Sequence, residues 1–215
     1  IISANFKVLA KPRNELTFVS PVPDIDTAAA ISDSLRPIAD RPVALVIRST
    51  GTSITISARY EGRQSGLQAV RSRVGAIFAG GMVLENEDST DYWQDIINER
   101  QYDPVRIWRI QIGCRPSETF AITQSILASA GSGVRAEIEP GLGTITIEHD
   151  GDLDLQALRR TSAGANIRIL DAPLVARQLN DIWGEPPSTL DLMRRLKDEY
   201  DPGRVLNRGR YAGYL

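Results

Sequence analysis

Residues 134–149 read VRAEIEPGLGTITIEH, and this stretch decides the fold. Apolar and polar side chains alternate over 134–138 and again over 144–149, which is typical of strands with one buried face. The segment Pro140-Gly141-Leu142-Gly143 between the two runs has the composition of a turn. The stretch therefore predicts a β-hairpin with one apolar and one polar face.

Strand and helix patterns flank this hairpin on both sides. The predicted elements are a strand over 105–113, a helix over 117–130, the hairpin itself, a short helix over 153–160 and a strand over 166–170. Strand, helix, strand, strand, helix, strand is the split β-α-β order of ferredoxin-like folds.

The first part of the chain shows the same order. Its predicted elements are a strand over 16–20, a helix over 24–38, strands over 43–48 and 53–60, a helix over 67–77 and a strand over 82–84. Residues 85–104 are polar and poorly periodic, so we interpret them as a connection between two repeats.

The repeats predict an α+β fold in which two ferredoxin-like split β-α-β units form an antiparallel sheet with the helices on one face. Each predicted helix has a single apolar stripe, and each clear strand has one polar side. The second face of the sheet is therefore expected to cover another molecule or domain. The fold itself names no function, because such units serve enzymes, RNA-binding proteins and regulatory modules alike.

Composition excludes several classes of protein. The 215 residues are 42% hydrophobic and 24% charged, which is typical of packed domains, and the net charge of -2 gives no general attraction for nucleic acid. Cys114 is the one cysteine, so this chain makes no disulfide or cysteine-ligated metal site by itself. A cytoplasmic location is the expectation, and no apolar run is long enough to span a bilayer.

Individual polar residues give weak signals. His149, the one histidine, is expected to be a half-exposed residue at a strand end, and Cys114 a buried, inert thiol. An acidic cluster in the predicted connection lacks the spacing of a calcium loop, so no metal site is predicted. Its members are Glu85, Glu87, Asp88 and Asp91. Two glycine-rich segments, 131–133 and 141–143, precede strands and are interpreted as turns, because a pyrophosphate site needs a helix N-terminus.

The C-terminal part predicts one more helix and a tail. Ser188 is placed to cap the helix, Leu192, Leu196 and Tyr200 repeat at i+4, and Asp201-Pro202-Gly203 ends it. Residues 193–210 contain six basic and three acidic residues. Composition alone favours a solvated basic surface, although an anionic neighbour would also fit.

The amino-acid sequence of this tail resembles that of a known family. LMRRLK (192–197), YDP (200–202) and VLNRGRY (205–211) are similar to the C-terminal signature of FAD-linked oxidases of the vanillyl-alcohol oxidase type. IWGEPP (182–187) and the strand around Trp108-Arg109 most resemble the FAD-binding subunit of glycolate oxidase. Residues 2–12 resemble the last strand of that family's FAD-binding domain. Arg208 departs from the pattern, because the family usually has proline there.

The resemblance implies that this chain is the second domain of a two-domain flavoprotein. In that family an N-terminal domain binds FAD, and the C-terminal domain covers the isoalloxazine ring. The implied division is 1–12 as the end of a missing FAD-binding domain, 13–184 as the substrate or cap domain, and 185–215 as a helix and tail returning towards the FAD domain. The opening run Ile1-Ile2-Ser3-Ala4, which is strand-like, agrees with a fragment.

The resemblance also implies the activity and the site residues. The parent protein would oxidise a 2-hydroxy acid of the glycolate or D-lactate type to a 2-oxo acid, together with a second flavin subunit and an iron-sulfur subunit at the inner membrane. Asn207 and Arg210 carry over as cofactor-binding residues. Arg109 is the candidate for the substrate carboxylate, since a guanidinium matches that group. An ion pair at a surface or domain interface is an equally good interpretation of Arg109, and no catalytic residue is predicted.

Two alternatives remain open. A non-enzymatic ferredoxin-like module would use its exposed sheet face to bind a protein or ligand. A degenerate subunit would bind flavin for assembly while a sister subunit performs the oxidation.

Overall fold

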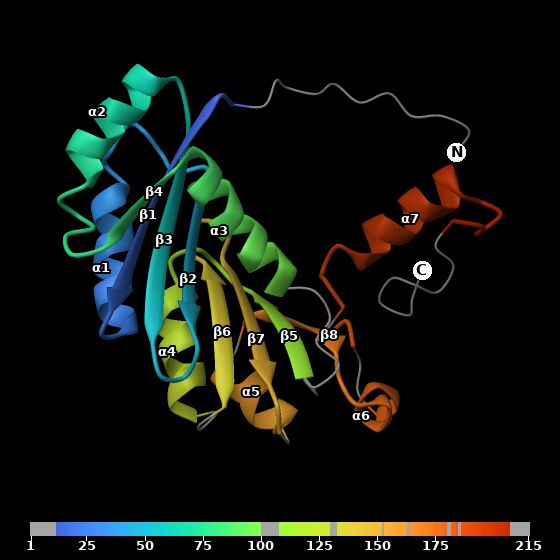
Figure 1. Ribbon diagram of the computed structural model, residues 1–215. Coiled ribbons are helices and arrows are strands. Elements are labelled where there is room, and N and C mark those ends of the chain that lie inside the picture. Colours follow the sequence, from blue (N-terminus) through green and yellow to red (C-terminus); the bar gives the residue numbers. More distant parts are fainter. Residues whose placement is uncertain are drawn as a thin grey trace. The chain divides into compact units, whose positions relative to one another are not determined.

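The structure is a computed structural model of the 215-residue chain, and it describes residues 12–99, 108–129, 133–151, 153–162, 164–179, 182–184 and 186–206. Hydrogen bonding gives an eight-stranded sheet of order β4-β1-β3-β2-β6-β7-β5-β8 (Figure 1). The predicted α+β class and the two split β-α-β units are confirmed. Contacts divide the described chain into unit 1, up to Val46 and from Thr55 to Glu99, and unit 2, which holds Ile47–Ile54 and everything from Trp108 onward.

Unit 1 contains the first repeat. Its elements are β1 (Asn14–Val22), α1 (Ile25–Leu35), the first half of β2 (Ala44–Ser49), most of β3 (Ile54–Gly62), α2 (Gln64–Val74), β4 (Met82–Glu85) and α3 (Asn86–Glu99). Asp24 caps α1 by accepting a hydrogen bond of 2.7 Å from the Thr27 N–H. Hydrogen bonding to the side chain and to the N–H of Thr27 lowers the pKa of the Asp24 carboxyl. Phe18 of β1 fills the core on one face, where its ring stacks on Phe78 at 5.3 Å.

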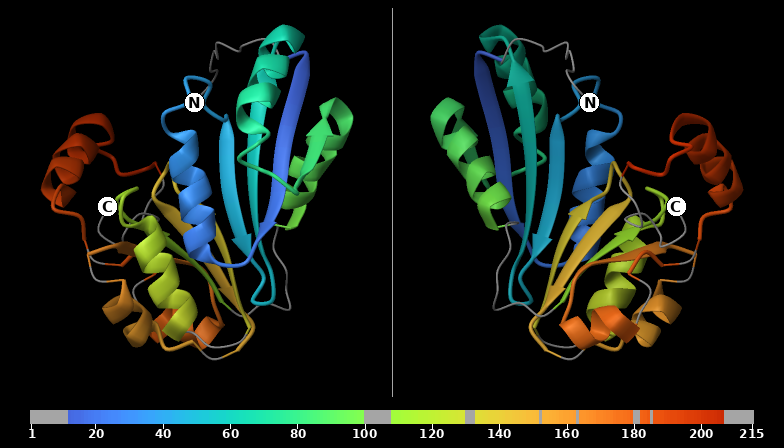
Figure 2. Two further views of the ribbon diagram at one scale, coloured as in Figure 1. Left: turned by 90° about the vertical axis from the view of Figure 1, so that its left-hand side faces the viewer. Right: turned by 90° about the vertical axis from the view of Figure 1, so that its right-hand side faces the viewer.

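Helix α3 corrects one sequence expectation. Residues 85–104 were predicted as a connection, but Asn86–Glu99 form a helix that packs on β1 and β4. Trp93 and Ile96 are its buried apolar residues, and they contact Val46 of β2. Figure 2 shows α1 and α3 on opposite sides of the unit 1 strands. The second face of this part of the sheet is therefore covered by the chain itself.

Polar side chains join α3 to the strands. Thr17 of β1 bonds to the Ser89 hydroxyl at 2.7 Å and accepts from the Trp93 indole N–H at 2.8 Å. Glu15, only 4% exposed, forms an ion pair of 2.7 Å with Arg59 of β3. Because such buried groups are costly without partners, this network fixes how α3 sits on the strands. The sequence of β1 does not alternate between polar, exposed residues and apolar, buried residues, because helices or side chains cover both faces of this strand.

Unit 2 contains the second repeat. Its elements are β5 (Trp108–Gly113), α4 (Thr119–Ser129), β6 (Val134–Glu139), β7 (Thr144–His149), α5 (Leu155–Thr161), β8 (Asn166–Asp171), α6 (Leu174–Leu179) and α7 (Leu190–Tyr200). Ile110 and Ile112 of β5, Ile145 and Ile147 of β7, and Ile138 of β6 are almost fully buried. Helix α4 packs on β6 and β7 over this apolar layer and also contacts α5.

Two helix details differ from the expectations. Thr189, rather than Ser188, occupies the N-cap position of α7, and its side chain makes no capping hydrogen bond there. The helix ends at Asp201 as predicted. Helix α6 was not predicted, and it exposes Leu174 and Val175. Within the described residues, no helix has the length and apolar character required to cross a lipid bilayer.

Candidate functional site

The candidate site is the polar face of unit 2, the side of its strands opposite the buried isoleucine layer. Residues on this face alternate in sequence with the buried ones and are half-buried or exposed. We define the polar face by Arg48 of β2, Arg135 and Glu137 of β6, Thr146 and Glu148 of β7, Arg109 and Gln111 of β5, and Arg168 of β8.

Strand register arranges the polar face in two rows. Arg135 lies opposite Glu148, and Glu148 lies opposite Arg109. The second row runs from Arg48 through Glu137, Thr146 and Gln111 to Arg168. Opposite charges on neighbouring strands attract, so both rows support the register.

Arg109 lies on the polar face, as its strand parity requires, and it faces an acid. Its Nε is 3.6 Å from Oε1 of Glu148, and both side chains are less than a third exposed. Arg48 and Glu137 form a looser pair at 4.0 Å. Arg109 therefore forms an ion pair on an accessible face. This position fits binding of a substrate carboxylate, and it equally fits an ion pair at a surface or domain interface. Asn207 and Arg210 lie outside the described residues.

A second feature of the polar face was missed by sequence reasoning. The guanidinium of Arg168 lies 5.2 Å from the centre of the Trp183 ring, which is a cation–π contact. Trp183 is held in place because Ile169 N–H donates to the Ile182 carbonyl at 2.8 Å, which adds segment 182–184 to the edge of β8. Alternation in 166–170 places Arg168 on this face, but its aromatic partner lies too far along the chain for a local pattern to find it.

Gly184 makes the close approach of this segment possible. Its φ is +77°, and a Cβ there would lie 2.4 Å from the Ile167 carbonyl oxygen. Only glycine fits both the backbone conformation and the space. The Trp-Gly pair that carries the family resemblance therefore has a structural role at the edge of β8.

The turn after α7 is built around one carboxylate. Asp201 accepts hydrogen bonds from the N–H groups of Val205 at 2.9 Å and Leu206 at 3.0 Å, and Lys197 Nζ lies 2.5 Å from its Oδ2. Lys197 and these two N–H groups hold the pKa of the Asp201 carboxyl below its ordinary value. The predicted Asp-Pro-Gly stop is thus an ordered turn.

The other single residues match structural roles. His149 is half-buried at the end of β7, and its Nδ1 accepts from the Gly151 N–H at 2.7 Å. Cys114 is partly buried, with Sγ 3.4 Å from the Gly143 carbonyl oxygen. Among the described side chains, no three His, Cys, Asp or Glu residues gather closely enough to hold a metal ion.

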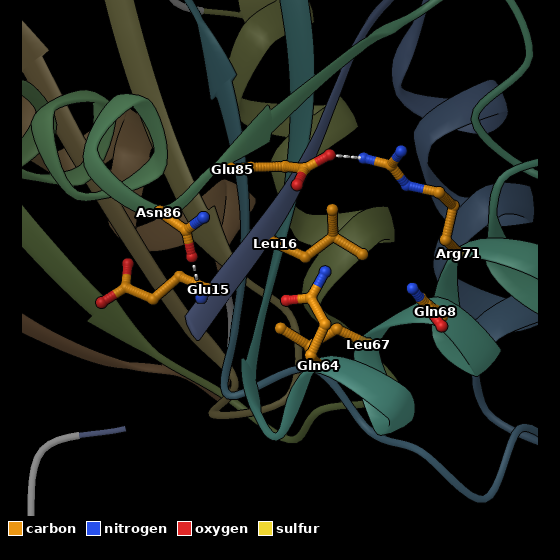
Figure 3. Close-up of a pocket in the computed structure, with 8 residues that line it drawn as sticks. All are labelled: Glu15, Leu16, Gln64, Leu67, Gln68, Arg71, Glu85 and Asn86. Atoms are coloured by element: carbon orange, nitrogen blue, oxygen red, sulfur yellow. Dashed lines mark hydrogen bonds and ion pairs between the residues drawn. The ribbon is translucent and has the colours of Figure 1, made fainter. Parts of the chain in front are cut away.

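Unit 1 contains a small pocket of about 90 Å³ (Figure 3). Its lining residues are Glu15, Leu16, Gln64, Leu67, Gln68, Arg71, Glu85 and Asn86. Arg71 pairs with Glu85 at its rim, and the Asn86 side chain accepts from the Glu15 backbone N–H. Pockets for drug-sized ligands usually have about 300 Å³ or more, so this pocket is smaller than that class of site.

Known structures share the fold of this chain. No protein-family profile matches it, and no curated protein sequence matches it either. Chitooligosaccharide oxidase aligns with a TM-score of 0.55 and 11% identity over 95% of this chain and 56% of its own. Xylooligosaccharide oxidase from Myceliophthora thermophila C1, in complex with xylobiose, aligns with a TM-score of 0.54 and 13% identity over 92% and 55%. Glucooligosaccharide oxidase from Acremonium strictum gives 0.53 and 8% over 90% and 54%.

These similarities show a shared fold. The chain has the architecture of a part of the carbohydrate oxidases, and it spans about half the length of each. The tail resemblance also pointed to FAD-linked oxidases, and the structures that share the fold of this chain carry oxidase names. The glycolate oxidase subunit is not among these three structures.

Replacing Gly184 should destabilise unit 2 through the close contact with Ile167. We expect Gly184→Ala to cost more than about 2 kcal/mol, because it adds a steric clash to the roughly 1–2 kcal/mol of a left-handed alanine. Gly164→Ala is the matched control, since Gly164 has a φ of +85° with open space around it. Urea denaturation of both variants measures the difference, and equal losses would contradict the assigned contact.

The turn after α7 should weaken in acid. Because the pKa of Asp201 is lowered in the folded chain, its contribution to stability is complete above the ordinary aspartate pKa and is lost as pH falls through the lowered value. Amide NMR shifts of Val205 and Leu206 should follow this titration, and Asp201→Asn should abolish it. A midpoint above the ordinary aspartate pKa would rule out the assigned interactions.

Proposed function

We propose that this chain is the C-terminal substrate domain of an FAD-dependent oxidoreductase. The observation that carries the proposal is the polar face of unit 2, a broad area of half-buried and exposed polar side chains whose opposite side is packed against helices. The fold shared with carbohydrate oxidases over at least 90% of this chain supports the class of protein. The tail signature of FAD-linked oxidases supports the same proposal from the sequence.

The described residues fit one part of an FAD site and not another. The polar face offers hydrogen-bonding groups to a flat ring, as a covering domain requires. Gly141-Leu142-Gly143 leads into β7, so it does not offer a helix N-terminus to a pyrophosphate. A separate N-terminal domain would therefore bind most of the cofactor, and Asn207 and Arg210 would contact it from the tail.

The reaction we propose is oxidation of an alcohol carbon to a carbonyl. The substrate loses two electrons and two protons, and FAD, when bound, supplies the electron acceptor. The residues of this chain bind the substrate, orient its reacting C–H bond and exclude water. No described residue is assigned as a base, so catalysis by this chain rests on orientation and charge.

Two substrate classes compete for the polar face. A 2-hydroxy acid of the glycolate or D-lactate type is our first candidate, because several arginines stand on the face and Arg109 is placed to contribute to carboxylate binding. A sugar is the second candidate, because the similar structures are oxidases named for oligosaccharides. Gln111 and Thr146 offer groups that hydrogen-bond to sugar hydroxyls.

The resemblance supports further partners. We propose that the parent protein works in the cytoplasm with a second flavin subunit and an iron-sulfur subunit, and that it reaches the inner membrane through them. As an isolated chain it would be inactive. A non-enzymatic binding module with the same fold is the alternative, and it would use the polar face without flavin.

Mixing the two parts of the parent protein tests the proposal. We expect the preceding part of the complete reading frame, produced separately, to co-purify with this chain and to retain visible flavin absorbance. The mixture should then oxidise glycolate or D-lactate, whereas xylobiose oxidation would favour the sugar alternative. If the flavin-loaded first part does not bind this folded chain, the proposal that the chain is a substrate domain is contradicted.

A further inference from the structure

The arginines of the polar face differ in their partners. Arg48 and Arg109 lie close to Glu137 and Glu148, so much of their charge is already compensated within the sheet. Arg168 is exposed on β8, and within the described part of the chain its recorded contact is the ring of Trp183. Its register partner is Gln111, an amide rather than an acid.

Trp183 restrains Arg168 without using its hydrogen-bond donors. A guanidinium over an aromatic face is attracted by the ring quadrupole, while the N–H groups at its edge stay available for an anion. The ring itself is restrained by the bond from Ile169 N–H to the Ile182 carbonyl and by the close approach of Gly184 to Ile167. Less side-chain entropy is therefore lost when Arg168 binds a ligand.

Neighbouring groups complete a ligand-sized row. Gln111 lies opposite Arg168, and Thr146 lies opposite Gln111 on the next strand. Side chains directly opposite each other in a sheet are about 5 Å apart, so an amide and a hydroxyl follow the guanidinium across the face. A carboxylate and an adjacent hydroxyl are the groups that this order of donors and acceptors matches.

We propose that Arg168, held by Trp183, binds the carboxylate of a small hydroxy acid, with Gln111 beside it. This inference rests on the proposed function for the reaction that follows, and it adds a binding residue to Arg109. The guanidinium receives the carboxylate through two parallel N–H···O bonds. The 2-hydroxyl group lies towards Gln111.

The test measures binding to the 215-residue chain itself. Arginine Nε–H resonances are followed by NMR during titration with glycolate, and with glycolamide as the uncharged analogue. We expect the Arg168 signal to shift with glycolate and not with glycolamide. Arg168→Gln should weaken glycolate binding by about 10-fold or more, because charge-assisted bonds are lost. Trp183→Leu should weaken it several-fold.

Arg160→Gln is the matched control, because Arg160 is an exposed arginine of unit 2 that lies on helix α5 and outside the polar face. Its affinity for glycolate should stay within about twofold of the unmodified chain. The inference is overturned if glycolate does not bind, if Arg168→Gln binds as tightly as the unmodified chain, or if Arg160→Gln weakens binding as much as Arg168→Gln does. None of these results bears on flavin retention in the mixing experiment, so failure of the carboxylate site and failure of the oxidoreductase assignment are distinguishable.

Discussion

The side-chain parity of β5 is the constraint on which unit 2 depends. Ile110 and Ile112 are completely buried, so Arg109 and Gln111 must stand on the opposite face. Pairing with β7 on one side and β8 on the other extends this division to Glu148 and Arg168. A shift of one residue would place arginines in the apolar layer and isoleucines on the polar face, at a cost far above the stability of a domain. The polar face is therefore fixed by the hydrophobic core.

The two units use the same order of elements differently. In unit 1, α3 covers the second face of the strands, and Thr17, Trp93 and the Glu15–Arg59 pair fill that interface. In unit 2 the corresponding face carries cross-strand charge pairs that remain partly exposed. A sheet face with partly compensated charges suits a polar ligand or another domain better than it suits an apolar core. This difference assigns the candidate site to unit 2.

Much of this fold could be predicted from alternation and turn chemistry. The hairpin of β6 and β7 and the strand β5 were predictable because their polar and apolar faces are distinct. Helix α3 was not, because few of its residues are apolar and its packing depends on hydrogen bonds to distant Thr17. The position of Arg109 on the polar face was predictable from alternation. Its pairing with Glu148 depends on the strand register, and the contact of Arg168 with Trp183 depends on the tertiary fold. The proposal of FAD came from the resemblance of the tail to FAD-linked oxidases, and neither alternation nor strand register points to a cofactor.

We propose that this chain completes a flavin-dependent oxidoreductase whose substrate binds to the polar face. The most direct measurement is the visible spectrum of the protein from the complete reading frame, recorded before and after anaerobic addition of glycolate or D-lactate. We expect a bound oxidised flavin whose absorbance bleaches when the hydroxy acid is added. A well-folded protein without flavin would contradict the proposal of a flavin-dependent oxidoreductase and would favour a binding module. A bound flavin that stays oxidised with hydroxy acids and with sugars would contradict the proposed oxidation and would favour an assembly subunit.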